Sequence, residues 1–145
     1  MRNLLLRSSA VVCLSFSVFI LAGCTQSGTT LSGKLVPPPG AKLAENDSVT
    51  IMFHPEDDAN KKHVLGVYNA ADNTFLAKDI PPGKYKVAVQ IQPYQGSPDS
   101  EKRAKSLDVY NAKYNRENTK ITYEVANDPK QSVSIDLEKG TATKN

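Results

Sequence analysis

Four stretches of this chain alternate apolar and polar side chains residue by residue, and this period of two is its most constraining feature. Successive side chains of a β-strand point to opposite faces, so each stretch predicts a strand with one apolar face. Such strands are typical of antiparallel sheets that cover a core on one side and meet water on the other. The apolar positions are Val49, Ile51, Phe53; Tyr85, Val87, Val89, Ile91; Ile121, Tyr123, Val125; and Val133, Ile135, Leu137.

Three weaker stretches raise the predicted number of strands to seven. They run from Leu31 to Val36, from His63 to Ala70 and from Thr74 to Lys78. Seven short strands separated by regular turns predict an all-β fold, a seven-stranded antiparallel Greek-key β-sandwich. With 39% hydrophobic and 23% charged residues, the composition fits one globular domain.

Turn-forming residues lie between the predicted strands. Asp72 and Asn73 suit a tight hairpin, because Asp and Asn tolerate a positive φ. Further along, Pro82 presets φ for the first central position of a type II turn, and Gly83 supplies the positive φ that the second position requires. The prolines at 37–39 end the first strand, since proline cannot donate to a sheet ladder.

Between the fifth and sixth predicted strands the apolar period changes from two to three or four. This spacing predicts one short helix, or a helical turn and loop, within residues 97–118. Ser97 as the cap and Pro98 at the first helical position would begin it. We expect its apolar stripe to pack over an edge or open end of the sandwich. The stripe consists of Ala104, Leu107, Tyr110 and Tyr114.

The first 24 residues predict an export signal. Arg2 and Arg7 precede the uncharged run Ala10–Ala22. This run is shorter than the roughly 20 apolar residues of a membrane span and has the length of a secretory signal's apolar region. Leu21-Ala22-Gly23-Cys24 resembles the bacterial lipobox, which implies cleavage before Cys24 and attachment of a diacylglycerol to its thiol. The alternative is an ordinary cleaved signal with an incidental cysteine.

The predicted organisation has four parts. A lipoprotein signal peptide covers residues 1–23, a flexible lipidated tether 24–30, the β-sandwich 31–138 and a disordered tail 139–145. Two or more acyl chains such as palmitate hold a protein stably on a membrane. Thr25 is not the aspartate that retains lipoproteins at the inner membrane in some bacteria, so we expect the outer membrane or cell surface of a bacterial envelope.

The charge of the mature chain gives no reason to expect a nucleic-acid partner. Removal of the signal leaves 16 Lys and Arg residues against 15 Asp and Glu residues, a net charge of +1 instead of +3. Lys102, Arg103 and Lys105 form a local basic cluster, but acidic residues surround it. We interpret the cluster as a solvated helix face.

The sequence predicts no enzyme, no cofactor and no metal site. It contains neither a His-Glu-x-x-His nor a Gly-x-Ser-x-Gly motif, and the mature chain would have no free thiol. The best polar group could in principle hold calcium through carboxylates, or zinc or copper through imidazoles. We expect instead that His54 faces outward and that the acidic residues form an exposed hairpin tip. This group consists of His54, Glu56, Asp57, Asp58 and His63.

Aromatic side chains offer a second kind of binding site, because tyrosine rings can stack on sugars. The candidates are Tyr68, Tyr94, Tyr110 and Tyr114. Tyr94 lies in a loop beside Pro93 and is expected to be the most exposed of them. Tyr110 and Tyr114 belong to the helical stripe and are expected to pack on the core.

Four segments together match the pattern of a known family: 31–35, 49–55, 72–75 and 79–87. They resemble carboxypeptidase regulatory-like domains. The resemblance covers most of residues 30–138 and implies a transthyretin-like sandwich, in which Phe75, Ile80 and Tyr85 are core residues and Gly83 is a backbone requirement. It implies no peptidase activity, since these are accessory domains. Asn73 stands where the family usually has glycine, which the turn chemistry permits. Three further segments resemble small bacterial lipoproteins of this type: 110–115, 121–125 and 133–137.

These observations predict a lipoprotein anchored to the membrane through Cys24, whose β-sandwich is a non-catalytic binding, adhesion or structural module. Its partner would be an envelope protein or a glycan. The alternative is a small glycan- or metal-binding accessory domain of an envelope enzyme or transporter. A hydrolase would rest on fold analogy alone.

Overall fold

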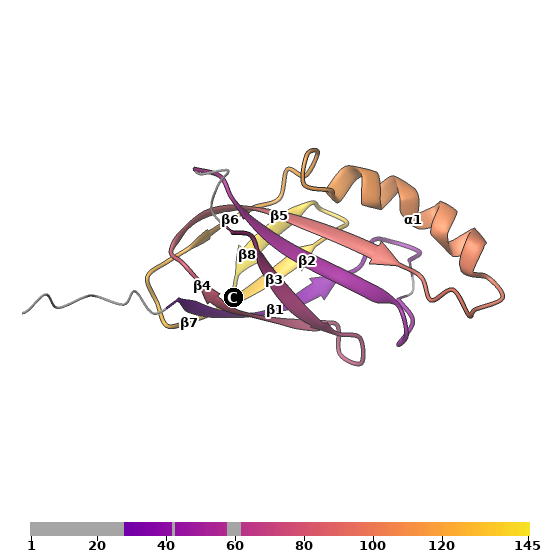
Figure 1. Ribbon diagram of the computed structural model, residues 1–145, viewed down its shortest axis with the longest axis horizontal. Helices are drawn as coiled ribbons and strands as arrows, with labels where there is room; N and C mark the ends of the chain where they lie inside the picture. Colours follow the sequence, from indigo (N-terminus) through magenta and orange to yellow (C-terminus); the bar gives the residue numbers. More distant parts are fainter. Residues whose placement is uncertain (1–27, 42, 58–61) are drawn as a thin grey trace, which may run out of the picture.

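A computed structural model of the protein describes residues 28–41, 43–57 and 62–145. The signal peptide, Cys24, residues 25–27 of the tether and Asp58 lie outside this range. Within the described residues, eight strands and one helix follow each other along the chain (Figure 1). They are β1 (Thr29–Val36), β2 (Ser48–Pro55), β3 (Val64–Asn69), β4 (Thr74–Ile80), β5 (Gly83–Gln92), α1 (Ser100–Tyr114), β6 (Thr122–Val125), β7 (Lys130–Asp136) and β8 (Thr141–Lys144).

The strands form one nearly closed, barrel-like sheet in the order β6-β5-β2-β3-β4-β1-β7-β8. The strand β3 joins its two halves, because Val64–Gly66 pair with β2 and Val67–Asn69 pair with β4. The first and last strands of the sheet, β6 and β8, approach each other. The buried amide of Gln131 on β7 helps to close this side, since its Nε2 donates to the carbonyl oxygen of Ala126 after β6 at 2.8 Å.

The mostly β fold and the helix between the fifth and sixth strands are confirmed, but three details of the predicted architecture differ. The eight strands do not form a clear sandwich, because β3 is shared between both halves of the sheet. The pair β1–β7 is parallel, whereas the other pairs are antiparallel. The eighth strand lies within residues 139–145, for which the sequence predicts a disordered tail. Ala142 is the only apolar residue of β8, so this strand has no apolar alternation to reveal it.

The predicted inward-facing residues form the core. All apolar positions of the four strong stretches are buried except Val49, which is half-buried and packs against the core. The Phe75 ring lies where a Cβ at Gly33 would be, with the nearest ring atom 2.2 Å from that point. Its centroid is 6.1 Å from that of Phe53, which is 6.4 Å from that of Tyr85. The expected core role of Phe75, Ile80 and Tyr85 is confirmed.

The turn residues adopt the predicted positive φ at two positions. Asn73, with φ of 56°, ends the loop between β3 and β4, although this loop has four residues, 70–73, instead of a tight two. Gly83 has φ of 148°, well beyond the roughly 80° of a type II turn. Asp79 also has a positive φ, of 58°, which the sequence did not predict. A Cβ at Gly28 would lie 2.4 Å from the Asp79 backbone, so the chain entering β1 is in close contact with this strained residue.

The helix α1 lies beside the end of β5, as the apolar stripe predicts (Figure 1). Leu107 and Tyr114 are buried, and Ala104 and Tyr110 are half-buried. Its start differs from the prediction, because the N-cap is Asp99 and not Ser97. The amide of Ser100 donates instead to the Ser97 carbonyl oxygen at 3.0 Å, in a turn that precedes the helix. No described helix is long and apolar enough to cross a membrane.

Candidate functional site

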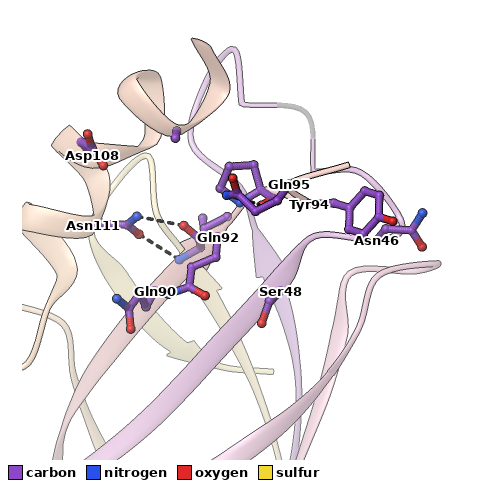
Figure 2. Close-up of a pocket in the computed structure, with 11 residues that line it drawn as sticks. Asn46, Ser48, Gln90, Gln92, Tyr94, Gln95, Asp108 and Asn111 are labelled. Atoms are coloured by element: carbon purple, nitrogen blue, oxygen red, sulfur yellow. Dashed lines mark hydrogen bonds between the residues drawn. The ribbon is translucent and has the colours of Figure 1, made fainter. Parts of the chain in front are cut away.

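An open groove of about 740 Å³ lies between α1 and the carboxyl end of β5 (Figure 2). We call it the α1 groove. Its walls come from four segments: the residues that begin β2, the end of β5, the loop that follows β5, and α1. It is lined by Asn46, Ser48, Gln90, Ile91, Gln92, Pro93, Tyr94, Gln95, Ala104, Asp108 and Asn111.

The lining of the α1 groove is polar but almost uncharged. Five of the eleven lining residues are Asn or Gln, and Asp108 is the one lining residue with a charged side chain. Each side-chain amide can both donate and accept hydrogen bonds. Tyr94, a residue that is 53% exposed, adds an aromatic ring. The groove therefore combines a flat apolar surface with several neutral hydrogen-bonding groups.

Asn111 attaches α1 to the edge of β5. The amide of Ile91 donates to Asn111 Oδ1 at 2.8 Å, and Asn111 Nδ2 donates to the Ile91 carbonyl oxygen at 2.8 Å. The short strand β6 pairs only with residues 83–86 of β5, so the Ile91 backbone needs another partner. Asn111 supplies it and fixes the distance between the two walls of the groove (Figure 2).

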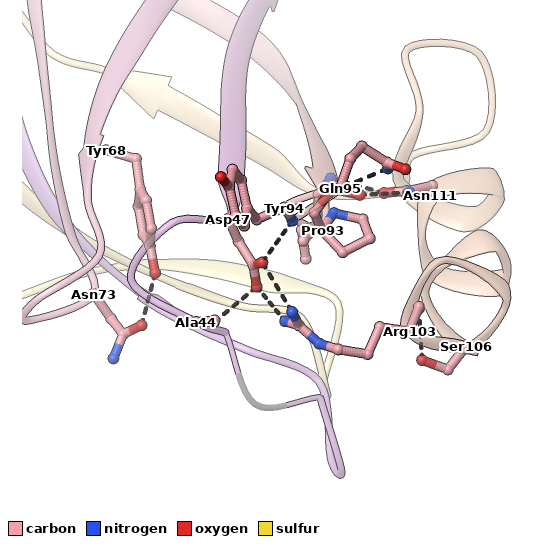
Figure 3. A network of polar contacts seen from close by, with 11 residues as sticks. Ala44, Asp47, Tyr68, Asn73, Pro93, Tyr94, Gln95, Arg103, Ser106 and Asn111 are labelled. Carbon is pink, nitrogen blue, oxygen red and sulfur yellow. Dashed lines mark hydrogen bonds and ion pairs between the residues drawn. The ribbon is translucent and has the colours of Figure 1, made fainter. Parts of the chain in front are cut away.

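A buried carboxylate holds the loop that carries Tyr94 (Figure 3). Asp47 accepts hydrogen bonds from the amide of Ala44 at 2.7 Å and from the amide of Tyr94 at 3.1 Å. The Arg103 guanidinium of α1 contacts both carboxylate oxygens, with Nη1 3.0 Å from Oδ1. Burial opposes ionisation of Asp47, but the hydrogen bonds and the charge of Arg103 outweigh it and lower the pKa of the carboxyl.

The pair of Asp47 and Arg103 was not found from the sequence. The interpretation of Arg103 as part of a solvated helix face is wrong, because its guanidinium binds the buried Asp47. Its neighbours Lys102 and Lys105 are exposed, as expected. Asp47 and Arg103 are 56 residues apart, so no local pattern joins them.

Of the four candidate tyrosines, Tyr94 is the one that is exposed at the α1 groove. Tyr114 is buried and donates its hydroxyl to the Leu137 carbonyl oxygen. Tyr110 is half-buried against the core, as predicted. Tyr68 is also half-buried and donates to Asn73 Oδ1 at 2.7 Å, which stabilises the hairpin loop.

The two histidines come together elsewhere, where β2 ends and β3 begins. Their ring centroids are 5.5 Å apart. His54 alternates with the core residue Phe53 and so lies on the outward face of its strand, as expected, but only 8% of it is exposed. Its Nε2 has no hydrogen-bond partner among the described residues. Burial lowers the pKa of His54, and the charges of Arg116 and His63 lower it further.

The acidic residues near the histidines do not complete a metal cluster. Glu56 and Asp57 are exposed, in agreement with the predicted hairpin tip. Among the residues with described positions, no group of three or more His, Cys, Asp or Glu side chains is arranged to hold a metal ion. The described chain thus places an imidazole pair, but no carboxylate cluster, at this end of β2.

No protein-family model, curated protein or solved structure matches this chain. Functional inference therefore depends on the fold and on the chemistry of its surface. Cys24 lies outside the described residues, so its lipidation stays a prediction from the sequence.

Proposed function

We propose that this protein is an exported, lipid-anchored lipoprotein of the bacterial cell envelope, and that its β-domain is a non-catalytic binding module. The α1 groove is the recognition surface. The observation that carries the proposal is the joint presence of an exposed aromatic ring, Tyr94, and several neutral amides on two walls that are fixed to each other.

The chemistry of the groove favours binding over catalysis. General acid–base catalysis needs positioned groups that exchange protons with the reacting atoms, and nucleophilic catalysis needs a nucleophile beside a base. Asp108 is the one carboxylate of the lining, and neither histidine belongs to it. Amides instead form neutral hydrogen bonds without moving protons, as a binding site requires.

The groove is organised before a ligand arrives. Asp47 holds the Tyr94 backbone, Arg103 ties Asp47 to α1, and Asn111 ties α1 to β5. Binding to a surface that is already ordered loses less conformational entropy than binding to a mobile one. A few weak contacts between the ligand and the groove are then sufficient for binding.

The fold places the groove away from the predicted anchor. Cys24 precedes Gly28 by four residues, which span at most about 14 Å. Gly28 contacts Asp79 near the start of β5, and the ten residues of β5 lead to the groove about 30 Å away. In Figure 1, β1 begins at one end of the long axis and the loop between β5 and α1 lies at the other. An anchored domain would therefore present the groove outward from the membrane.

We also propose that the sheet is a variant of the transthyretin-like fold of carboxypeptidase regulatory-like domains. The neighbouring order β2-β3-β4-β1 is a Greek key, which supports the proposal. A helix between the fifth and sixth strands supports it as well. This fold would provide a rigid support and would not by itself define a ligand.

A neutral glycan is the ligand class that the groove favours, as in the accessory-domain alternative. The exposed Tyr94 ring offers a flat apolar face on which a sugar ring can stack. Gln90, Gln92 and Asn46 offer donors and acceptors for hydroxyl groups. The near absence of charge argues against strongly anionic or cationic ligands.

The test is a glycan array probed with the purified chain, followed by calorimetry with the best ligand. We expect Tyr94→Ala to weaken binding at least tenfold, because it removes the stacking surface. Val109→Ala is the matched control: Val109 is exposed on α1 but outside the groove lining, so affinity should not change. Binding that is insensitive to Tyr94→Ala would contradict the assignment of the groove.

The anchor has a separate test. Mass spectrometry of the protein from bacterial membranes should find a diacylglycerol-modified amino-terminal Cys24. The Cys24→Ser variant should leave the membrane fraction, because it cannot carry the lipid. An unmodified amino terminus on membrane-bound protein would refute the lipoprotein assignment without affecting the groove.

A further inference from the structure

The histidine pair is a cross-strand pair on the outer face of the sheet. In the antiparallel register of β2 and β3, Met52 pairs with Leu65 and Phe53 pairs with Val64. Continued by one position, this register places His54 opposite His63, on the side of the sheet away from the buried Phe53. The 5.5 Å between the ring centroids agrees with this placement.

His54 has the features of a ligand that lacks its metal. A buried polar atom without a hydrogen bond destabilises the fold, and His54 Nε2 is such an atom among the described residues. Since His63 is exposed and its ring adjoins that of His54, an ion could reach the pair from solvent. An ion bound between the two rings would give the buried nitrogen a partner.

The ring separation suits one shared ion. Imidazole nitrogens bind zinc or copper at about 2 Å, and two such ligands at a tetrahedral ion have ring centroids roughly 5 Å apart. The observed 5.5 Å is close to this separation, and His63 is exposed.

The neighbouring residues favour copper. Met52 lies two residues before His54 on the same strand and hence on the same face, and its thioether is a ligand that selects copper. Imidazole also suits copper, which lies above zinc in the affinity order of divalent ions. Calcium is disfavoured, because it takes six or more oxygen ligands.

The surrounding charges limit the affinity. Lys86 pairs with His54 from the β5 side, Lys62 precedes His63, and Arg116 acts on His54 electrostatically. These cations repel a metal ion. Glu56 and Asp57, which follow β2, offset part of this repulsion.

We propose that His54 and His63 bind one copper ion, with Met52 as an additional thioether ligand. This site would be independent of the α1 groove, whose lining contains neither histidine.

The test uses the full chain with Cys13→Ser and Cys24→Ser, so that no thiol competes for copper. The chain is purified in detergent through a tag without histidine. The sequence contains two histidines, so imidazole nitrogen coupling in the electron paramagnetic resonance spectrum of bound Cu²⁺ reports this pair alone. We expect one Cu²⁺ per chain, imidazole coupling and a higher unfolding temperature with copper than with calcium.

Three variants locate the site. His63→Gln, at an exposed position, should weaken Cu²⁺ binding at least tenfold while circular dichroism shows the same fold. Met52→Leu should weaken binding of Cu⁺ under ascorbate, and Tyr94→Ala should leave copper binding unchanged. The proposal is overturned if the unsubstituted chain binds no copper at micromolar concentration, or if His63→Gln binds it equally well. Unchanged Cu⁺ affinity of Met52→Leu would remove Met52 from the site.

Discussion

Gly33 shows how single residues set the core of this protein. The Phe75 ring of β4 occupies the space next to the Gly33 Cα on β1. On β3, at the other side of β4, the same ring lies 3.2 Å from where a Cβ at Gly66 would be. The Phe75 ring thus packs against two glycines and also contacts the ring of Phe53. A side chain at Gly33 would force Phe75 to move, and a closely packed interior resists such a movement.

We expect Gly33→Ala to destabilise the fold by about 1–3 kcal/mol, the usual cost of overpacking a core. Urea unfolding followed by circular dichroism measures the change. Lys34→Ala is the control, because Lys34 is exposed on the same strand and its removal should have little effect. Equal stability of Gly33→Ala and the unsubstituted protein would show that the ring can repack freely.

Asp47 makes stability depend on pH. Its pKa in the folded state lies below the value near 3.8 expected for an unfolded aspartate. Its ionised form therefore stabilises the fold above pH 4, and this contribution is lost as the pH falls through the folded-state pKa. Asp47→Asn should lower stability by roughly 2 kcal/mol at pH 7, because charge-assisted hydrogen bonds are lost. Unfolding curves at pH 7 and pH 3 should show this difference shrinking in acid; a constant difference would contradict the role of the charge.

At the scale of elements, α1 protects the edge of β5 that β6 leaves free. The strand β6 has four residues and β5 has ten, so most of the outer edge of β5 depends on α1 and the segment after it. Asn111 binds Ile91, and Thr119 Oγ1 donates to the Val87 carbonyl oxygen at 2.7 Å. Unpaired strand edges invite pairing with other chains, so this cover also guards against aggregation.

Asn111→Ala should loosen α1 from β5. Two hydrogen bonds are lost, so we expect about 1–2 kcal/mol of destabilisation and faster hydrogen exchange at the Ile91 amide. Affinity for the groove ligand should fall as well, because the two walls lose their link. Lys105→Ala, an exposed substitution on the same helix, is the control. Unchanged exchange at Ile91 would mean that Asn111 does not hold the helix.

At the scale of the whole molecule, the start of β1 and the α1 groove lie at opposite ends. Thr29 Oγ1 donates to the carbonyl oxygen of Asp128 at 2.7 Å and contacts that of Ala126 at 3.2 Å, so the loop around Asn127 lies at the end where the described chain begins. Gln95 lies at the groove, beyond the far end of β5. A lipid on Cys24 would bring the first end close to the bilayer and leave the second in solvent.

Fluorescent probes attached through Asn127→Cys or Gln95→Cys test this orientation in lipid vesicles. A quencher on the lipid headgroups should quench the probe at position 127 strongly and the probe at position 95 little. In the proposed mature lipoprotein, Cys13 has been removed with the signal peptide and the Cys24 thiol is lipidated, so neither would compete for the probe. Equal quenching at both positions would contradict an outward-facing groove.

Much of the fold could be predicted from the sequence, but little of the candidate site. The alternation from Tyr85 to Ile91 and the stripe ending at Tyr114 identified a strand and a helix. Tyr94 could be singled out because a loop tyrosine between proline and glycine is commonly exposed. The groove around it could not be predicted, because its walls come from residues 46–48, 90–95 and 104–111, which only the folded chain brings together.

The sequence by itself determined which side chains face the core, where the chain turns at Asn73 and Gly83, and where the strands give way to a helix. These features depend on local periodicity and on the backbone preferences of single residues. Only the tertiary structure decided the parallel pairing of β1 with β7, the strand β8, the burial of His54 and the ion pair of Asp47 with Arg103. Each of these depends on contacts between segments that are far apart along the chain. The residue pattern within one segment does not indicate which distant segment it will contact.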